Sequence, residues 1–244
     1  MKGNFFSKPL EYKLTIAGEA WTQGEIITGS LIIEDHSKKI TSMSELGCHL
    51  CYCSRKKLKD KDPKAITVFD SALIQNDNNE LSFKFPLQDD CPISDSLGSF
   101  YIICGDMAHP FDTGMLELKI NPSKVISDFV QVFESFYRFK VKSFKNKKDY
   151  IVAAVTPPDS KEWAKLQKMN IQLKHKQDQF DVEFITTLKK IALEHSITTT
   201  KDENKVFKKT LSKKEYERFG ATNQDAFNKL IQEVLEQVKL KPIL

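Results

Sequence analysis

The first half of the chain consists of short segments in which hydrophobic and polar residues alternate. Alternation with a period of two is typical of strands that bury one face and expose the other. Such segments, divided by turn residues, are predicted at 9–16, 26–34, 40–55, 65–75, 81–85, 100–104 and 116–120. Seven or more short strands separated by turns predict a β-sandwich for residues 1–121.

The clearest alternation lies in the stretch 81–105, which reads LSFKFPLQDDCPISDSLGSFYIICG. Three apolar residues, Leu81, Phe83 and Phe85, alternate with polar ones. Pro86 then ends the strand, because proline has no N–H to donate to a neighbouring strand. A loop rich in Pro, Ser and Asp follows, and the next strand is apolar enough to be buried on both faces. The stretch therefore predicts a strand, a crossing loop and a central strand.

A second informative stretch, residues 21–33, reads WTQGEIITGSLII. Gly24 is placed where a tight turn needs a positive φ, which glycine adopts without steric cost. Gly29 interrupts a β-branched strand, so it marks a bulge or a close approach of the backbone to another group.

These two stretches, in this order, resemble the arrestin-like superfamily, and the resemblance covers about residues 8–120. In that superfamily an aromatic residue and Gly-Glu precede a glycine-containing strand. A strand ending in Phe-Pro, a loop with Pro and Ser, and a Tyr-bearing strand come later. The resemblance implies a mainly β protein with two tandem immunoglobulin-like sandwich domains.

Arrestins, retromer-type cargo subunits and bacterial sporulation-control proteins share this resemblance, so it implies the fold better than the task. The function that it implies is a non-enzymatic adaptor or scaffold that binds a partner protein through sheet edges and loops. Arrestin phosphate-sensing residues have no matching motif here. The Pro-Pro-x-Tyr motif of α-arrestins is also absent, because Pro157 and Pro158 are followed by Asp159 and Ser160.

Helical spacing of apolar residues appears twice in the second half of the chain. Asn121 and Pro122 are predicted to begin a helix over 122–137 that connects the two halves. Residues 138–244 then form a Lys-rich second β domain, in which the segments 196–200 and 206–211 are predicted as a strand pair around the loop KDENK. Thr222 is predicted to cap an amphipathic C-terminal helix over 222–240.

The net charge of +4 is unevenly distributed along the chain. Residues 138–218 contain 20 Lys and Arg against 11 Asp and Glu. Strand alternation sorts several lysines onto an outer sheet surface, with Lys140, Lys142 and Lys174 as candidate partner-binding residues. An anionic surface or an acidic protein would be the partner. The alternative is that these lysines are only solvated surface.

The five cysteines all lie in the first half of the chain, and three of them, Cys48, Cys51 and Cys53, belong to one predicted strand. Residues two apart on a strand lie about 6.6 Å from each other, which is awkward for a disulfide. We therefore expect free, buried thiols, no metal site and a cytoplasmic protein. No apolar run is long enough to span a membrane.

Catalytic and nucleic-acid-binding functions have weaker support. His109 lies between Asp106 and Asp112 in GDMAHPFDTG, which has the composition of a turn. A β-sandwich ligand-binding protein or hydrolase with a pocket near His109 is the alternative to an adaptor. No phosphate-binding loop or dinucleotide-binding motif is present, so no cofactor is expected. The aromatic and basic residues of RFKVKSFKNKK also fit an amphipathic strand, so nucleic acid is an unlikely partner.

Overall fold

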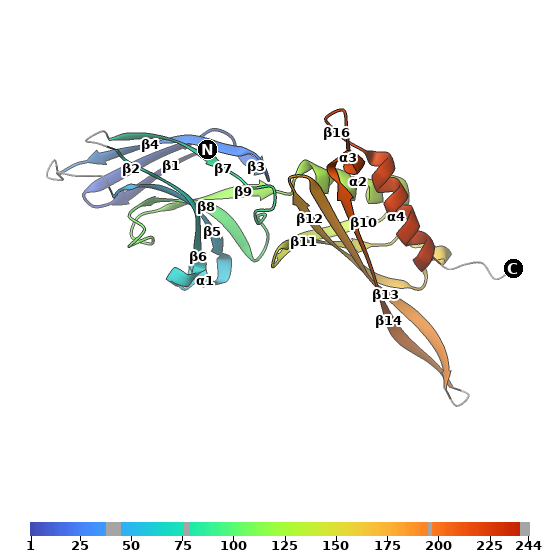
Figure 1. The fold of residues 1–244 in the computed structure, drawn as a ribbon. Helices are drawn as coiled ribbons and strands as arrows, with labels where there is room; N and C mark the ends of the chain where they lie inside the picture. Colours follow the sequence, from blue (N-terminus) through green and yellow to red (C-terminus); the bar gives the residue numbers. More distant parts are fainter. Residues whose placement is uncertain (38–44, 76–78, 195–196, 240–244) are drawn as a thin grey trace. The chain divides into compact units, whose positions relative to one another are not determined.

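The computed structural model describes residues 1–37, 45–75, 79–194 and 197–239, apart from the side chains of 190–200. It divides into two compact units, Met1–Asn121 and Pro122–Leu244 (Figure 1). No helix in the described residues is both long and apolar enough to cross a membrane.

The first unit contains two β-sheets that face each other. One sheet has the strand order β1-β2-β4-β7 and the other has the order β3-β9-β8-β5-β6. All pairs are antiparallel except β3 with β9. The elements in chain order are β1 Lys2–Ser7, β2 Leu10–Ile16, β3 Ala20–Thr22, β4 Ile26–Asp35, β5 Gly47–Ser54, α1 Arg55–Lys59, the 3₁₀ helix η1 Pro63–Ala65, β6 Ile66–Leu73, β7 Glu80–Pro86, β8 Gly98–Gly105 and β9 Met115–Asn121.

The core of this unit confirms the predicted alternation. Phe83 and Phe85 are 4% and 1% exposed and stack with ring centroids 4.8 Å apart, whereas Lys84 between them is exposed. Gly29 lies opposite Phe83 on the neighbouring strand β4. A Cβ at Gly29 would come within 2.5 Å of both the Phe83 ring and the Thr15 carbonyl oxygen. The predicted close approach at this glycine is therefore real, because the aromatic ring occupies the space of the missing side chain.

Two strands of the first unit were not predicted. β1 carries two consecutive aromatic residues instead of a clear alternation, and it pairs only with β2 at the edge of its sheet. β3 is three residues long and exists because it pairs with β9, a contact distant in sequence. The turn at Gly24, predicted from the sequence, has a φ of 87°. The predicted strand segment 40–44 lies outside the described residues.

The second unit is built on one five-stranded antiparallel sheet with the order β10-β11-β12-β13-β14. Figure 1 shows helices packed on this sheet, and β13 and β14 continuing beyond the other strands as a two-stranded ribbon. The elements in chain order are α2 Lys124–Tyr137, β10 Lys140–Lys147, β11 Tyr150–Thr156, the 3₁₀ helix η2 Lys161–Trp163, β12 Leu166–Lys176, β13 Gln179–Glu194, β14 Ile197–Ser212, α3 Lys213–Tyr216, β15 Glu217–Arg218, β16 Ala221–Thr222 and α4 Gln224–Val238.

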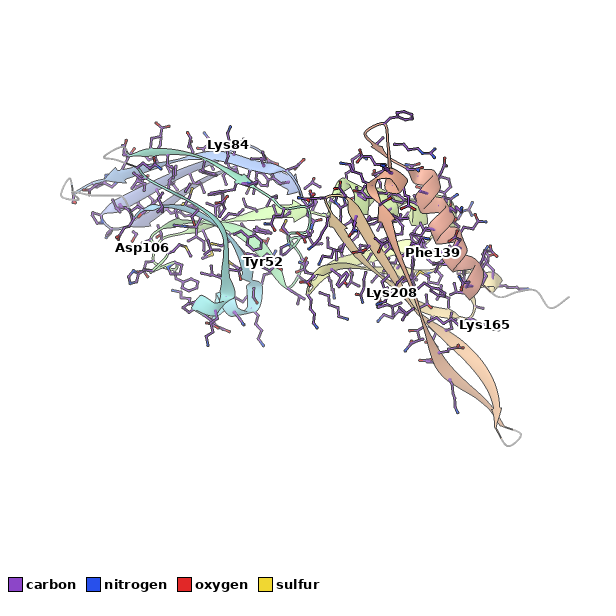
Figure 2. The ribbon with its side chains drawn as sticks, in the orientation of Figure 1. Tyr52, Lys84, Asp106, Phe139, Lys165 and Lys208 are labelled. Atoms are coloured by element: carbon purple, nitrogen blue, oxygen red, sulfur yellow. The ribbon has the colours of Figure 1, made fainter. Side chains whose placement is uncertain are left out.

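Aromatic packing joins the helices of the second unit to its sheet. Phe129 of α2 makes edge-to-face contacts with Phe180 of β13 and with Phe227 of α4, at centroid distances of 5.4 and 5.2 Å. Phe133 packs in the same way against Phe139, which is 1% exposed (Figure 2). The prediction of two sandwich-like domains is confirmed, and in the second domain the layer that covers the sheet consists of helices. The helix expected to connect the halves belongs to this layer.

Both helices start two residues later than predicted, at Lys124 and Gln224. Ser123 caps α2, with its Oγ accepting from the Ile126 N–H at 3.5 Å, so Asn121 and Pro122 lie before the helix. Asn223 caps α4 in the same way. Thr222 was expected to be that cap, but its hydroxyl donates to the Asp128 carboxylate instead. Polar residues before each helix compete for the capping position, and tertiary contacts decide which one takes it.

The predicted loop KDENK is wrong, because residues 201–205 lie inside the continuous strand β14. Their partners on β13 run from Thr186 to Lys190 in unbroken register. Pairing with a long neighbouring strand therefore outweighs the turn-forming composition of this segment.

Substitutions on the two faces of β7 test this core directly. We expect Phe85→Ala to lower the free energy of unfolding by about 3–5 kcal/mol, because it leaves a cavity between the sheets. Lys84→Ala should change it by no more than about 0.5 kcal/mol. Urea unfolding of both variants measures these values, and similar losses for the two would contradict the assigned register.

Candidate functional site: the edge strand β6

The strand β6, which reads ITVFDSAL, is the last strand of its sheet. It pairs with β5 on one side, and among the described strands none pairs with its other side. In an antiparallel sheet alternate residues direct both backbone N–H and C=O away from a given neighbour. The outer side of β6 is therefore a row of backbone donors and acceptors available to an added strand.

Local structure fixes where β6 begins. The Asp62 side chain accepts a hydrogen bond from the backbone N–H of Lys64 at 2.9 Å and caps the 3₁₀ turn η1. Ala65, the last residue of this turn, is 4% exposed. The short helix α1 lies before this turn, with Leu58 packed against a small cluster that contains Cys51 and Cys53. The start of β6 is thus anchored to the outer face of its own sheet.

A β-bulge shapes the middle of the strand. Leu50 of β5 lies opposite Asp70 and Cys51 lies opposite Val68, so Phe69 is an extra residue without a partner on β5. Its ring makes an edge-to-face contact with Phe100 at 4.9 Å while remaining 39% exposed. Bulges of this kind are common at sheet edges and redirect a side chain.

Apolar side chains of β6 are exposed on one face of the sheet. Val68 is 48% exposed and Leu73 is 43% exposed. Their partners on β5 are Cys51 and Gly47, which are an even number of residues apart, so both side chains lie on the same face. This edge thus combines free backbone groups with two exposed apolar side chains that the bulge places on one face.

Four of the other edge strands have features that discourage strand addition, whereas the edge strand β1, KGNFFS, has only one lysine at its start. The edge strand β10 carries four lysines in eight residues, and β14 carries lysines at 201, 205, 208 and 209. The edge strand β7 has one lysine and ends in Pro86, and β3 is only three residues long. Lysine, proline and shortness are the usual means of blocking an edge. β6 has neither lysine nor proline, and its blocking features are the bulge at Phe69 and one charged residue, Asp70.

His49 connects β6 to the centre of the sheet. Its Nε2 lies 3.2 Å from the Gly105 carbonyl oxygen and its Nδ1 lies 2.8 Å from the Ser71 hydroxyl. The carbonyl can only accept, so Nε2 carries the proton and Nδ1 accepts from Ser71. Burial lowers the pKa of His49 below its ordinary value, which favours this neutral form.

The three lysines predicted to bind a partner do not form one cluster. Lys140 lies opposite Thr156 at one end of β11, whereas Lys174 contacts the Tyr150 ring at the other end, at 5.5 Å from the centroid. Six residues of strand separate these ends by about 20 Å. Lys174 also lies 3.9 Å from the Asp149 carboxylate and is only 16% exposed. Acidic side chains therefore intermix with this basic face, as the 3.1 Å pair of Lys208 (Figure 2) with Glu183 also shows.

Lys142 has a different environment from the other two. It falls at the register shift of β10 between Val141 and Ser143. Its side chain is exposed and lines an open groove of about 460 Å³ between β10 and α2. The groove also contains the Glu134 carboxylate, which accepts a hydrogen bond from the Val141 backbone at 3.3 Å. A partner-binding role for these lysines stays a prediction.

The residues considered for chemistry are an exposed histidine and buried thiols. The His109 side chain is 71% exposed on a turn, 3.6 Å from the Asp106 carboxylate. The five cysteines are free and buried, and burial raises the pKa of Cys51 to about 12 and that of Cys53 to about 11. Cys51 and Cys53 share a face of β5, while Cys48 points into the core between the sheets.

One group of side chains has donors that a metal ion could use. Ligand atoms of Glu11, Glu34 and His36 lie within 4.8 Å of one another. The ammonium group of Lys13 lies 2.6 Å from Glu34 and 3.9 Å from Glu11. Because Lys13 already compensates the carboxylates, the group is explained as an ion-pair network.

A two-sheet first unit followed by a sandwich-like second unit defines the arrestin-like fold, as the sequence resemblance implied. The structure is similar to the crystal structure of Spo0M, a sporulation control protein from Bacillus subtilis, with a TM-score of 0.61. The match covers 94% of this chain and 99% of Spo0M at 10% sequence identity. No family model and no curated protein sequence matches the chain. At such low identity the structural similarity supports a shared fold and no shared function.

The buried histidine gives a testable pH dependence. Because the pKa of His49 is lowered in the folded state, the unfolded state binds more protons as the pH falls below the ordinary value of 6.5. We expect the free energy of unfolding to decrease between pH 6.5 and pH 5, by at most about 1.4 kcal/mol per pH unit from this group. Urea unfolding of the wild type and of His49→Gln should show a smaller slope in the variant. Equal slopes would contradict the assigned state of His49.

Proposed function

We propose that this protein is a non-enzymatic adaptor that binds an extended segment of a partner protein by strand addition along β6. The observation that carries the proposal is the free edge of β6, which has exposed apolar side chains and neither lysine nor proline. Every hydrogen bond to an added strand would use backbone groups, each contributing about 1 kcal/mol. Such binding suits an adaptor, because it recognises any partner segment that is extended and carries a few matching side chains.

The side chains of β6 set the specificity of this binding. Val68 and Leu73 are exposed on one face, so an added strand would place its own alternate side chains beside them. The partner segment should therefore carry apolar residues at alternate positions. Phe69 already packs on Phe100 and serves to shape the edge.

Photocrosslinking in a native lysate tests the proposal. A photoreactive phenylalanine derivative replaces Val68 in one variant of the full chain. As a control it replaces Val206, which is 51% exposed on the lysine-rich edge strand β14. We expect a discrete covalent adduct from position 68 and none from position 206, because β14 carries four lysines along its edge and β6 carries none.

A second substitution verifies that the adduct depends on the edge. Leu73→Lys adds a charge to the same face of β6 and should reduce the adduct formed from position 68 by at least about tenfold. Since Leu73 is 43% exposed, the variant should retain the wild-type melting temperature. Adducts of equal yield from both positions, or none from position 68, would rule out strand addition at β6.

A further inference from the structure

The strand β1 is a free edge of the other sheet in the first unit. It pairs with β2 on one side, and among the described strands none pairs with its other side. The carbonyl of Met1 accepts a hydrogen bond from the Ile16 N–H at 2.9 Å, so Met1 directs its backbone groups toward β2. Backbone direction alternates along an antiparallel strand, and Lys2, Asn4 and Phe6 therefore direct theirs away from β2. These three residues form the free backbone row of β1.

One face of β1 is exposed and the other is anchored. The side chains of Lys2, Asn4 and Phe6 are exposed, and that of Phe6 is 62% exposed. Phe5 points the opposite way and packs against the core of the unit. Its ring occupies the space that a side chain at Gly114 would need. Because β1 is already held in its extended conformation, adding a strand to it costs little conformational entropy.

The free row of β1 is complementary to itself. Two copies can pair antiparallel with Asn4 opposite Asn4 on a two-fold axis, and Lys2 of each copy then lies opposite Phe6 of the other. Every residue of both rows is paired in this register, and each opposed pair exchanges two backbone hydrogen bonds. A shift by two residues would either place Lys2 opposite Lys8 of the turn or leave Phe6 without a partner residue. The self-pairing therefore has one preferred register.

The side chains of this register also fit one another. The Asn4 amide both donates and accepts hydrogen bonds, so it can pair with its own copy, whereas a charged residue on the axis would repel itself. The Lys2 ammonium lies beside the Phe6 ring in a cation–π arrangement. On the inward face Phe5 lies opposite Gly3, which has no side chain to collide with the ring. No like charges are directly opposed.

We propose that β1 joins two copies of this protein in a two-fold dimer, in which the two β1-β2-β4-β7 sheets become one continuous sheet. The partner is a second copy because the free row of β1 pairs with itself in full, and its one lysine meets a ring instead of another charge. Three paired residues from each copy make a small interface, so the dimer is weak and reversible. The dimer carries two β6 edges, but its formation does not use β6, so the two proposals can fail independently.

A cysteine on the two-fold axis traps this dimer. In Asn4→Cys the introduced residues face each other at a Cα separation of about 5.5 Å, which a disulfide can span. The native cysteines are buried and do not compete in the folded protein. The matched control is Ser82→Cys, because Ser82 is exposed on β7, the opposite edge strand of the same sheet. Both full-length variants are oxidised with diamide, and the covalent dimer is measured on non-reducing gels.

We expect the disulfide-linked dimer of Asn4→Cys to exceed that of Ser82→Cys at least about fivefold, because only position 4 meets its own copy. Equal yields from the two positions would overturn the proposal.

Sedimentation velocity tests the register without a covalent trap. We expect the dimer fraction of the wild type to rise with protein concentration up to about 0.1 mM. Phe6→Lys opposes two lysines in each dimer and should weaken association at least about tenfold, whereas adding Lys2→Glu should restore it through opposite charges. Since Phe6 is 62% exposed, the variants should keep the wild-type melting temperature. A wild type that stays monomeric over this range, or no loss in Phe6→Lys, would contradict the proposed dimer.

Discussion

The first unit depends on the packing of two stacked phenylalanine rings, one of which occupies the space left by the missing side chain of Gly29. Phe83 and Phe85 stack on β7, and Phe83 fills the space next to Gly29 on β4. This contact fixes the register of two adjacent strands, because a shift by one residue would turn both rings into solvent. The apolar faces of the two sheets then close on each other and leave β6 at the end of its sheet.

Features that depend on local alternation could be predicted from the sequence. The inward rings of β7, the turn at Gly24, the separate faces of Cys48 and Cys51, and the C-terminal helix all follow from period, glycine or capping chemistry. Features that depend on pairing with strands distant in sequence could not be predicted in this way. The strand β3 forms only against β9, and residues 201–205 are strand only because β13 lies beside them.

The candidate site illustrates the same limit. The sequence indicated sheet edges in general, but the strand order decides which strand is an edge, and the order is a tertiary property. The composition of ITVFDSAL, with high β-propensity and neither lysine nor proline, does not single out β6, because the paired strands β4 and β8 share it. The lysines predict a binding patch, and that prediction stands untested. Many of them occupy the edge strands β10 and β14, where lysine also discourages strand pairing.

Amide hydrogen exchange measured by mass spectrometry tests the central claim, the free edge of β6, most directly. In the free protein we predict that the amides of 66–73 exchange much faster than those of β5, which is paired on both sides by β6 and β8. Addition of the partner identified by crosslinking should slow exchange at 66–73 and leave β10 and β14 unchanged. Protection of 66–73 equal to that of β5 in the free protein, or no change on addition of the partner, would contradict the account.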